Sequence, residues 1–152
     1  MTITIERVDW ADEAGTELRR AQRAELDARY GSDDHEPGTP PSVDDIAVFL
    51  VARDEAGTPI GCGGLRLLGE GRAEIKRMFV APQARGAGVA VAVLRALEAE
   101  AGSLGVVEML LETGTAQPDA MRFYEREGYA PIAVFGPYVD EPLSRCYARR
   151  LD

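Results

Sequence analysis

The stretch that most constrains the fold of this chain is residues 74–91, with the sequence EIKRMFVAPQARGAGVAV. Its first part, residues 74–80, is rich in apolar and β-branched side chains, which is typical of a strand. Pro82 cannot donate to a sheet ladder, and Gly86 and Gly88 can adopt backbone angles that are closed to other residues. A strand, a sharp turn and a helix start are therefore predicted. Such a helix start presents free N–H groups and a positive dipole end, which favour phosphate.

The spacing of the glycines distinguishes between known phosphate-binding loops. A P-loop requires Gly-Lys-Ser or Gly-Lys-Thr, and the chain contains neither. A dinucleotide-binding fingerprint counted from Gly86 requires a small residue at its last position, where this chain has Val91. This spacing argues against a dinucleotide-binding domain. A tight strand-to-helix connection without a ligand remains an alternative reason for the glycines.

The pattern Arg-x-x-Gly-x-Ala resembles the pyrophosphate loop of the GNAT superfamily of acyl-CoA-dependent N-acyltransferases. The resemblance assigns the coenzyme A pyrophosphate to Arg85, Gly86, Ala87, Gly88, Val89 and Ala90. A second family pattern follows downstream, at Leu110, Leu111, Glu112, Thr113, Gln117, Ala120, Tyr124, Gly128 and Tyr129. The resemblance covers nearly the whole chain and is weakest over residues 11–45. It implies an N-acetyltransferase that uses acetyl-CoA as co-substrate and needs no metal.

Hydrophobic periodicity predicts the order of the elements. Alternating or continuous apolar runs predict strands at 3–8, 46–53, 59–68, 74–80, 106–113, 129–135 and 144–151. Apolar residues at three- and four-residue spacing predict helices at 13–30, 88–101 and 117–127. A helix separates 74–80 from 106–113, so these two strands are expected to be parallel. The predicted class is α/β (α+β): a GNAT-like, mixed, mostly antiparallel sheet flanked by helices, in one domain over residues 1–152.

In the resembled family the central parallel strands splay apart, and the pantetheine arm of the cofactor lies in the gap like an added strand. The resemblance assigns the arm and the acyl end of the cofactor to Met78, Phe79, Val80 and Tyr124. Arg85 is expected to add a charge-assisted contact to the pyrophosphate. The resemblance also assigns a contact with the amide arm of the cofactor to Gln117, at a position where the family often has asparagine. Glutamine keeps the amide but extends its reach by one methylene.

Acyl transfer to an amine requires that the amine lose a proton. A free ammonium group with a pKa of about 10 is neutral in about one molecule in a thousand at pH 7, a cost of about 4 kcal/mol. Glu74 aligns with the strand glutamate that acts as the base in some family members. Lys76 lies on the same face of the predicted strand, so the alternative for Glu74 is an ion pair with Lys76.

The departing thiolate must gain a proton. Tyr124 occupies the position at which the family keeps its general acid. A phenol with a pKa of about 10 can protonate a thiolate with a pKa of about 8.5 at a cost of about 2 kcal/mol. The alternative for Tyr124 is a tyrosine of the core. A catalytically silent module that binds or senses acyl-CoA is the alternative function, and the presence of both Glu74 and Tyr124 argues against it.

The composition limits the class of partner. The net charge is −9, which disfavours nucleic acid and anionic membranes and favours cationic small molecules. The expected acceptor is an amine of a small molecule or peptide, and the expected assembly is a monomer or homodimer.

No basic region followed by a long apolar run opens the chain, which predicts a cytoplasmic protein. Cys62 and Cys146 are expected to be buried thiols. His35 lies in a polar loop at 31–44 that the resemblance places on the acceptor side. The alternative for this loop is a solvated charged loop without a role in binding.

Overall fold

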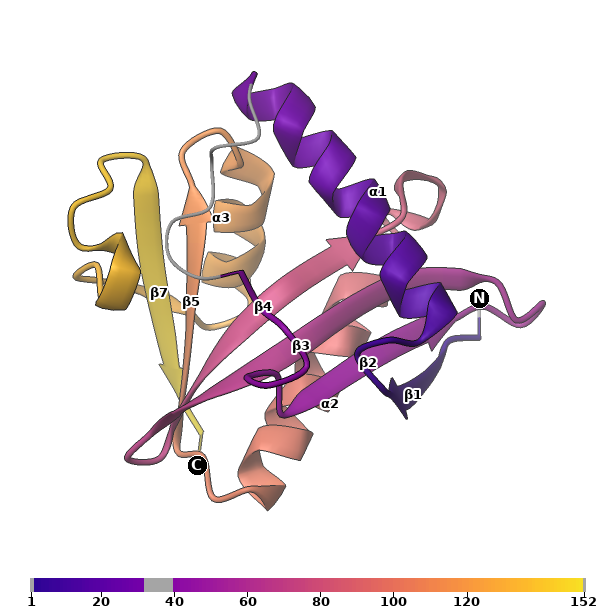
Figure 1. The fold of residues 1–152 in the computed structure, drawn as a ribbon, viewed down its shortest axis with the longest axis horizontal. Helices are drawn as coiled ribbons and strands as arrows, with labels where there is room; N and C mark the ends of the chain where they lie inside the picture. Colours follow the sequence, from indigo (N-terminus) through magenta and orange to yellow (C-terminus); the bar gives the residue numbers. More distant parts are fainter. Residues whose placement is uncertain (1, 32–39, 152) are drawn as a thin grey trace.

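The computed structural model describes residues 2–31 and 40–151. The described strands form one seven-stranded sheet in the order β1-β2-β3-β4-β5-β7-β6 (Figure 1). They are β1 (Thr4–Val8), β2 (Val48–Arg53), β3 (Pro59–Gly69), β4 (Arg72–Val80), β5 (Glu108–Gly114), β6 (Ala130–Ile132) and β7 (Ser144–Arg150). The pair β4 and β5 is parallel, and the other neighbouring pairs are antiparallel. The predicted mixed, mostly antiparallel sheet with one central parallel pair is therefore confirmed.

Helices cover both faces of the sheet. Helix α1 (Glu13–Tyr30) crosses one face, while α2 (Val89–Ser103) and α3 (Pro118–Arg126) lie on the other (Figure 1). The bounds of α1 match the prediction, because the Asp12 carboxylate caps the N–H of Gly15 at 3.1 Å and Gly31 ends the helix with φ 73°. Helix α2 was predicted to end before Gly102, but it continues to Ser103.

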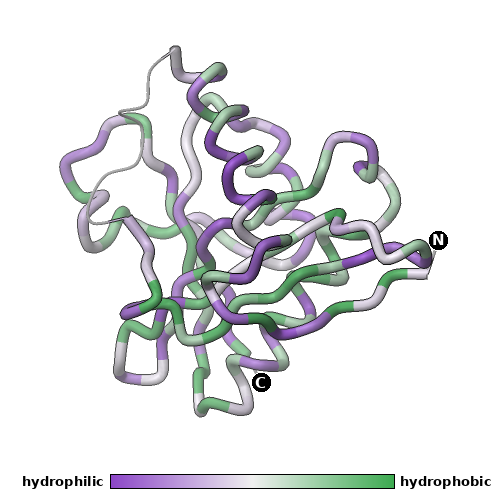
Figure 2. Tube along the Cα trace, turned by 45° about the vertical axis from the view of Figure 1, so that its right-hand side comes forward, coloured by the Kyte–Doolittle hydropathy of each residue, from purple (hydrophilic) through white to green (hydrophobic). Residues whose placement is uncertain are grey.

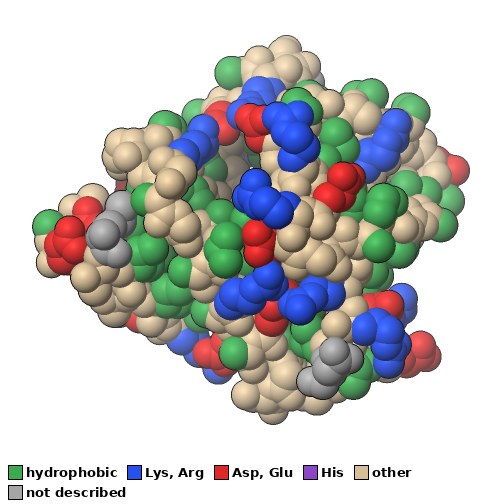
Figure 3. All heavy atoms as spheres, turned by 180° about the vertical axis from the view of Figure 1, so that it is seen from behind, with side chains coloured by type: hydrophobic (Ala, Val, Ile, Leu, Met, Phe, Trp, Pro, Cys, Tyr) green, Lys and Arg blue, Asp and Glu red, His purple; other side chains and the backbone are tan. Residues whose placement is uncertain are grey.

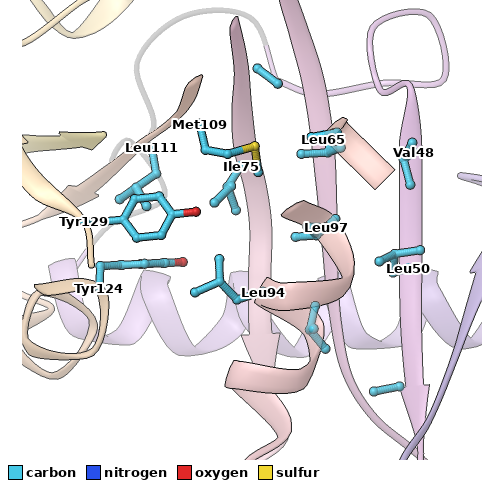
Figure 4. Close-up of a cluster of buried hydrophobic side chains, with 14 of the residues drawn as sticks. Val48, Leu50, Leu65, Ile75, Leu94, Leu97, Met109, Leu111, Tyr124 and Tyr129 are labelled. Atoms are coloured by element: carbon cyan, nitrogen blue, oxygen red, sulfur yellow. The ribbon is translucent and has the colours of Figure 1, made fainter. Parts of the chain in front are cut away.

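The core consists of two layers because alternate residues of each strand face opposite ways. On the α2 side, Val48 and Leu50 pack with Leu97, as the close-up in Figure 4 shows. On the α1 side, Phe49 packs with Leu18. Hydrophobic segments are accordingly concentrated in the central strands (Figure 2). Strand β2 is therefore buried on both faces, which explains why its sequence is apolar throughout.

The glycines of β3 mark both a close approach and a bulge. A Cβ atom placed on Gly63 would lie 2.9 Å from Leu97 Cδ1 and 3.0 Å from Met78 Sδ, so only glycine lets α2 pack this closely. The register shifts between Cys62 and Gly64, opposite the extra residue of β4, where Arg77 has φ 58°. A bulge therefore interrupts the β3–β4 ladder, with its extra residue in β4.

The ladder between β4 and β5 is short. It runs from the pair Arg72 and Glu108 to the pair Ile75 and Leu111. Beyond that pair, β4 continues to Val80 and β5 to Gly114 without pairing with each other. The splay expected of the central pair is therefore present. We call the residues directly after the last pair, Lys76 on β4 and Glu112 on β5, the splay point.

The segment between α3 and β7 differs from the prediction. Strand β6 covers only Ala130–Ile132, and a 3-10 turn, η2 (Gly136–Tyr138), follows it. This turn buries Tyr138 completely. A second 3-10 turn, η1 (Pro82–Ala84), leads from β4 towards α2. The predicted polar loop at 31–44, with His35, lies largely outside the described residues.

Candidate active site

A cleft of about 380 Å³ opens at the splay point. Its walls come from α1, β4, β5, α3 and the loop before β7. Gln22 of α1 lines it from one face of the sheet, and Tyr124 of α3, a member of the α2-side core layer, lines it from the other. The cleft therefore reaches both faces through the gap between β4 and β5.

One edge of β4 faces this gap. The N–H of Ala81 donates to Ile60 of β3 at 2.9 Å, so the backbone groups of alternate residues, Met78 and Val80, point away from β3. The carbonyl of Met78 accepts a hydrogen bond from Gln22 Nε2 at 2.9 Å, and that of Val80 accepts one from Arg85 Nε at 3.0 Å. Side chains thus cover the carbonyls to which an added strand would bond.

Phe79 was also expected to contact the cofactor, and the structure places it differently from Met78 and Val80. Its side chain is 7% exposed and packs in the α1-side core layer with Leu18 and Cys62. Like Val80, and unlike Met78, it does not line the cleft. Its backbone pairs with Cys62 of β3, so Phe79 fixes the position of the β4 edge without contacting the gap.

The loop after β4 has the conformation expected of an anion site. Gly86 and Gly88 have φ 82° and 83°, and a Cβ atom on either would meet no atom within 4 Å. Both glycines are therefore required by backbone angle and leave open space above the loop. Gly88 is the N-cap of α2 and no side chain caps the first turn, so the N–H groups of Val89 and Ala90 have no partner within the helix. Ala87 is exposed between the glycines.

Arg85 already has protein partners beside this loop. Besides Val80, its guanidinium binds Glu25 of α1 at 2.7 Å, and 42% of the Arg85 side chain is exposed. Glu25 also pairs with Arg29 at 3.4 Å. A pyrophosphate contact by Arg85 would therefore have to share or replace the contact with Glu25.

Tyr124 lines the cleft from α3. It is 6% exposed, and its ring packs edge-on against Phe123 and Tyr129 at centroid distances of 5.0 and 5.7 Å. Figure 4 shows Tyr124 and Tyr129 projecting side by side into the core. Burial raises the pKa of the Tyr124 phenol, so it stays protonated at neutral pH. Tyr129 differs because its hydroxyl donates to Glu98 at 2.8 Å.

Glu74 lies beside the cleft but is not part of its lining. It is 2% exposed and accepts a hydrogen bond from the Tyr138 hydroxyl at 2.5 Å. Lys76 Nζ lies 3.8 Å from its carboxylate, and Arg66 lies 3.7 Å from it on the other side. The ion pair with Lys76, the alternative considered from the sequence, is thus present. Direct contact between Glu74 and an acceptor in the cleft would require these partners to move.

Two charged residues at the splay point line the cleft and were not assigned to the site from the sequence. Lys76 reaches it from β4 and Glu112 from β5. The carboxylate of Glu112 accepts a hydrogen bond from the Ser144 hydroxyl at 2.7 Å. A signal for Glu112 does exist in the sequence, because it is a carboxylate on a strand that is otherwise apolar in its centre.

Polar groups of the cleft lining also fit an extended amide ligand. Gln117, the N-cap of α3, donates through Nε2 to the Tyr30 hydroxyl at 3.2 Å. Gln22 and Thr113 line the cleft, and their buried atoms Oε1 and Oγ1 have no hydrogen-bond partner among the described residues. A buried unsatisfied polar atom costs about 1–3 kcal/mol, so both atoms favour a ligand with polar groups here. These donors and acceptors are of the kind that the amide-rich arm of coenzyme A can bond.

Other groups contribute little to a site. Burial raises the pKa of the Cys62 thiol to about 12, and both cysteines are buried and free, as expected. No cluster of three or more potential metal ligands occurs within 2–31 and 40–151.

No helix in the described part of the chain is long and apolar enough to cross a membrane. On the face covered by α2, arginines and acidic side chains interleave (Figure 3).

The acetyltransferase (GNAT) family model matches residues 8–129, which is most of the chain. The chain belongs to the GNAT acetyltransferase family. A crystal structure assigned as an acyl-CoA N-acyltransferase from Klebsiella pneumoniae is 33% identical to this GNAT chain. That match has a TM-score of 0.82 and covers 99% of both chains. The family and fold predicted from the sequence are therefore confirmed.

Further relatives of this GNAT chain have been named. An IAA acetyltransferase from Azospirillum brasilense is 44% identical over 97 residues, which are 63% of this chain and 63% of the relative. The chain spans 63% of the length of each curated relative it matches. The crystal structure of PaiA N-acetyltransferase from Thermoplasma acidophilum in complex with coenzyme A matches with a TM-score of 0.72 at 17% identity, over 99% of this chain and 100% of that one. This last match shows a shared fold.

Proposed function

We propose that this GNAT protein is an N-acetyltransferase that moves an acetyl group from acetyl-CoA to a primary amine of a small molecule or peptide. The observation that carries the proposal is the unpaired edge of β4, which leads from the splay point to the uncapped first turn of α2. An extended amide chain can add to this edge like a strand, and its diphosphate then meets the start of the helix. The cleft with Tyr124 lies at the other end of the same edge.

The residues that would hold the cofactor follow from this placement. Met78 and Val80 offer backbone groups to the pantetheine arm, and Gly86 and Gly88 allow the N–H groups of the loop to surround the diphosphate. Arg85 adds a cation once it shares or releases Glu25. The bound thioester supplies the activated acetyl group. The protein's own residues orient it and move protons.

Tyr124 is proposed as the general acid that protonates the leaving sulfur. Burial raises the pKa of Tyr124, which by itself makes the phenol a weaker acid. A thiolate formed in the same dry cleft is also an anion, so burial penalises it as well. The difference between the two groups therefore stays near the value for exposed groups, about 2 kcal/mol.

Two carboxylates compete for the role of base. A base that accepts the proton directly must lie within hydrogen-bond reach of the amine. Glu112 lines the cleft at the splay point, whereas Glu74 is screened by Tyr138 and Lys76. The geometry therefore favours Glu112, and Glu74 would act only through its neighbours. The variants Glu112→Gln and Glu74→Gln can be compared in the same amine assay. The variant with the larger loss of kcat identifies the base.

A cationic amine is the acceptor class that the cleft favours. Glu112 and Glu141 bring carboxylates to its acceptor side, and the whole chain carries a net charge of −9. An amine library with detection of released thiol is the direct screen. The compound in the name of the Azospirillum brasilense relative, IAA, belongs in that screen.

Thermal unfolding with added ligands tests the proposal first. At one hundred times its Kd, acetyl-CoA should raise the free energy of unfolding by about 2.7 kcal/mol, while NAD and ATP should leave it unchanged. The absence of a shift at millimolar acetyl-CoA would reject the proposed cofactor. A shift without turnover of any amine in the library would favour a catalytically silent binding or sensing module.

We further propose that residues 1–152 act as one catalytic domain. A cytoplasmic location, a monomeric or homodimeric state and the lack of nucleic-acid partners remain predictions from the sequence. Gel filtration with light scattering tests the oligomeric state.

A further inference from the structure

The chain contains a single lysine, and that lysine lines the reaction cleft. Lys76 is 8% exposed and begins the unpaired part of β4, directly after the pair Ile75 and Leu111. The other cationic side chains are arginines, whose guanidinium groups stay protonated and are not nucleophiles at neutral pH. The amino group of lysine is chemically the same as the acceptor proposed above. The cleft therefore carries a primary amine of its own.

The contacts of Lys76 hold this amine against one wall. Nζ donates to the Tyr138 hydroxyl at 3.1 Å and lies 3.8 Å from the Glu74 carboxylate. Tyr138 in turn donates to Glu74 at 2.5 Å. Nζ must leave these contacts, and lose a proton to free its lone pair, before it can attack a thioester. They should slow acylation of Lys76 without moving it out of the cleft.

We propose that Lys76 is a self-acetylation site, an inference that rests on the proposed function. Nζ of Lys76, once deprotonated, attacks the carbonyl carbon of the acetyl thioester. A C–N bond forms, the C–S bond breaks, and the nitrogen loses its second proton while the departing sulfur gains one. The products are Nε-acetyl-Lys76 and free coenzyme A. Tyr124, across the cleft, is placed to protonate the sulfur in this reaction as in the proposed one.

Acetylation of Lys76 would change the cleft in two ways. It would remove the positive charge that faces Glu74, and it would leave a neutral acetamide at the splay point. The acetamide reduces the space available to an acceptor, and the loss of the positive charge changes the electrostatic potential that the acceptor meets. Chains that meet acetyl-CoA without an acceptor should therefore accumulate in a modified form with lower turnover.

The single lysine makes the test simple. The purified full chain is incubated with acetyl-CoA and no amine, and intact mass and peptide mapping follow the product. We expect a mass increase of about 42 Da located on Lys76, with a rate independent of protein concentration. Lys76→Arg should not gain this mass on that peptide. Mapping separates Lys76 from the N-terminal amine.

A second variant measures how fast an exposed lysine reacts with unbound acetyl-CoA. Arg20 lies on α1 with 67% of its side chain exposed, so a Lys76→Arg, Arg20→Lys double variant carries its only lysine in solvent. Lys76 in the native chain should react about 10- to 100-fold faster than that surface lysine, because binding positions the thioester next to it. Glu74→Gln should react about tenfold faster than the native chain, because it removes the carboxylate that holds Nζ at the wall of the cleft. Tyr138→Phe serves the same purpose if Glu74→Gln does not fold.

The outcomes separate this inference from the proposed function. A rate at Lys76 equal to that of the surface lysine would overturn it, because only solution chemistry would then be seen. If only the Glu74→Gln variant became acetylated, the self-acetylation proposal would be overturned for the native chain. If Lys76 stays unmodified while acetyl-CoA still stabilises the fold and an amine is turned over, the inference fails and the proposed function stands. Without any binding of acetyl-CoA, both fail.

Discussion

Replacement of Tyr124 by phenylalanine should separate catalysis from folding. The substitution removes one hydroxyl and keeps the ring that packs against Phe123 and Tyr129. Burial is the cause of the raised pKa of Tyr124, with no hydrogen bond contributing to the shift, so the free energy of unfolding should change by less than about 1 kcal/mol. If Tyr124 protonates the leaving thiolate, kcat should fall by about 10²- to 10⁴-fold, a loss of about 3–5 kcal/mol.

Tyr129→Phe is the matched control because it is the neighbouring buried tyrosine but does not line the cleft. Its hydroxyl donates to Glu98 at 2.8 Å, so its loss leaves a buried carboxylate short of one donor. This should lower the free energy of unfolding by about 1–3 kcal/mol and leave kcat within a few-fold of the native value. The two tyrosines should therefore show opposite patterns.

The assay combines release of thiol from acetyl-CoA, with an amine found in the library screen, and calorimetric titration of acetyl-CoA for Kd. For Tyr124→Phe, Kd should stay within about threefold of the native value while kcat falls. Full activity of Tyr124→Phe would refute the general-acid assignment. An equal loss of binding, stability and turnover would instead identify Tyr124 as a tyrosine of the core.

Three further predictions concern single side chains. Gly88→Asp should weaken acetyl-CoA binding at least about 100-fold more than Gly88→Ala, because both strain a backbone with φ 83° but only the first repels a diphosphate; equal Kd values would contradict this. Gly114→Ala would place a Cβ atom 1.7 Å from the Tyr30 hydroxyl, so chemical denaturation should show a loss of about 1–3 kcal/mol. For Glu98, burial acts to raise the pKa, but hydrogen bonds from Tyr129, Arg95 and Arg149 outweigh it and hold the pKa below its usual value. Its stabilisation is thus present above about pH 4.3 and lost as pH falls through the lowered pKa, so Glu98→Gln should be less stable at pH 7 and should unfold with a shallower dependence on acid.

Local signals were sufficient to predict the part of the site that binds the cofactor in our proposal. Pro82, Gly86 and Gly88 mark the end of β4 and the start of α2 within a few residues, because each acts through its own backbone angles. The parallel pair followed from the helix that connects its strands. These inferences need no knowledge of distant contacts.

The surroundings of Glu74 could not be predicted in this way. Alternation along β4 placed Glu74 and Lys76 on one face, and the ion pair between them is present. The group that covers them is Tyr138, from a turn 64 residues further along the chain. Periodicity shows which way a side chain points, whereas only the folded chain shows which loop covers it.

The splayed strands also have a consequence for solubility. An unpaired strand edge is a template for pairing with other chains, and here such an edge lies inside the sheet. Gln22 and Arg85 occupy the two carbonyls of that edge, so a foreign strand would have to displace both side chains before it could pair. We therefore expect these two side chains to oppose aggregation, so removal of both should make the ligand-free protein more prone to form intermolecular β-structure.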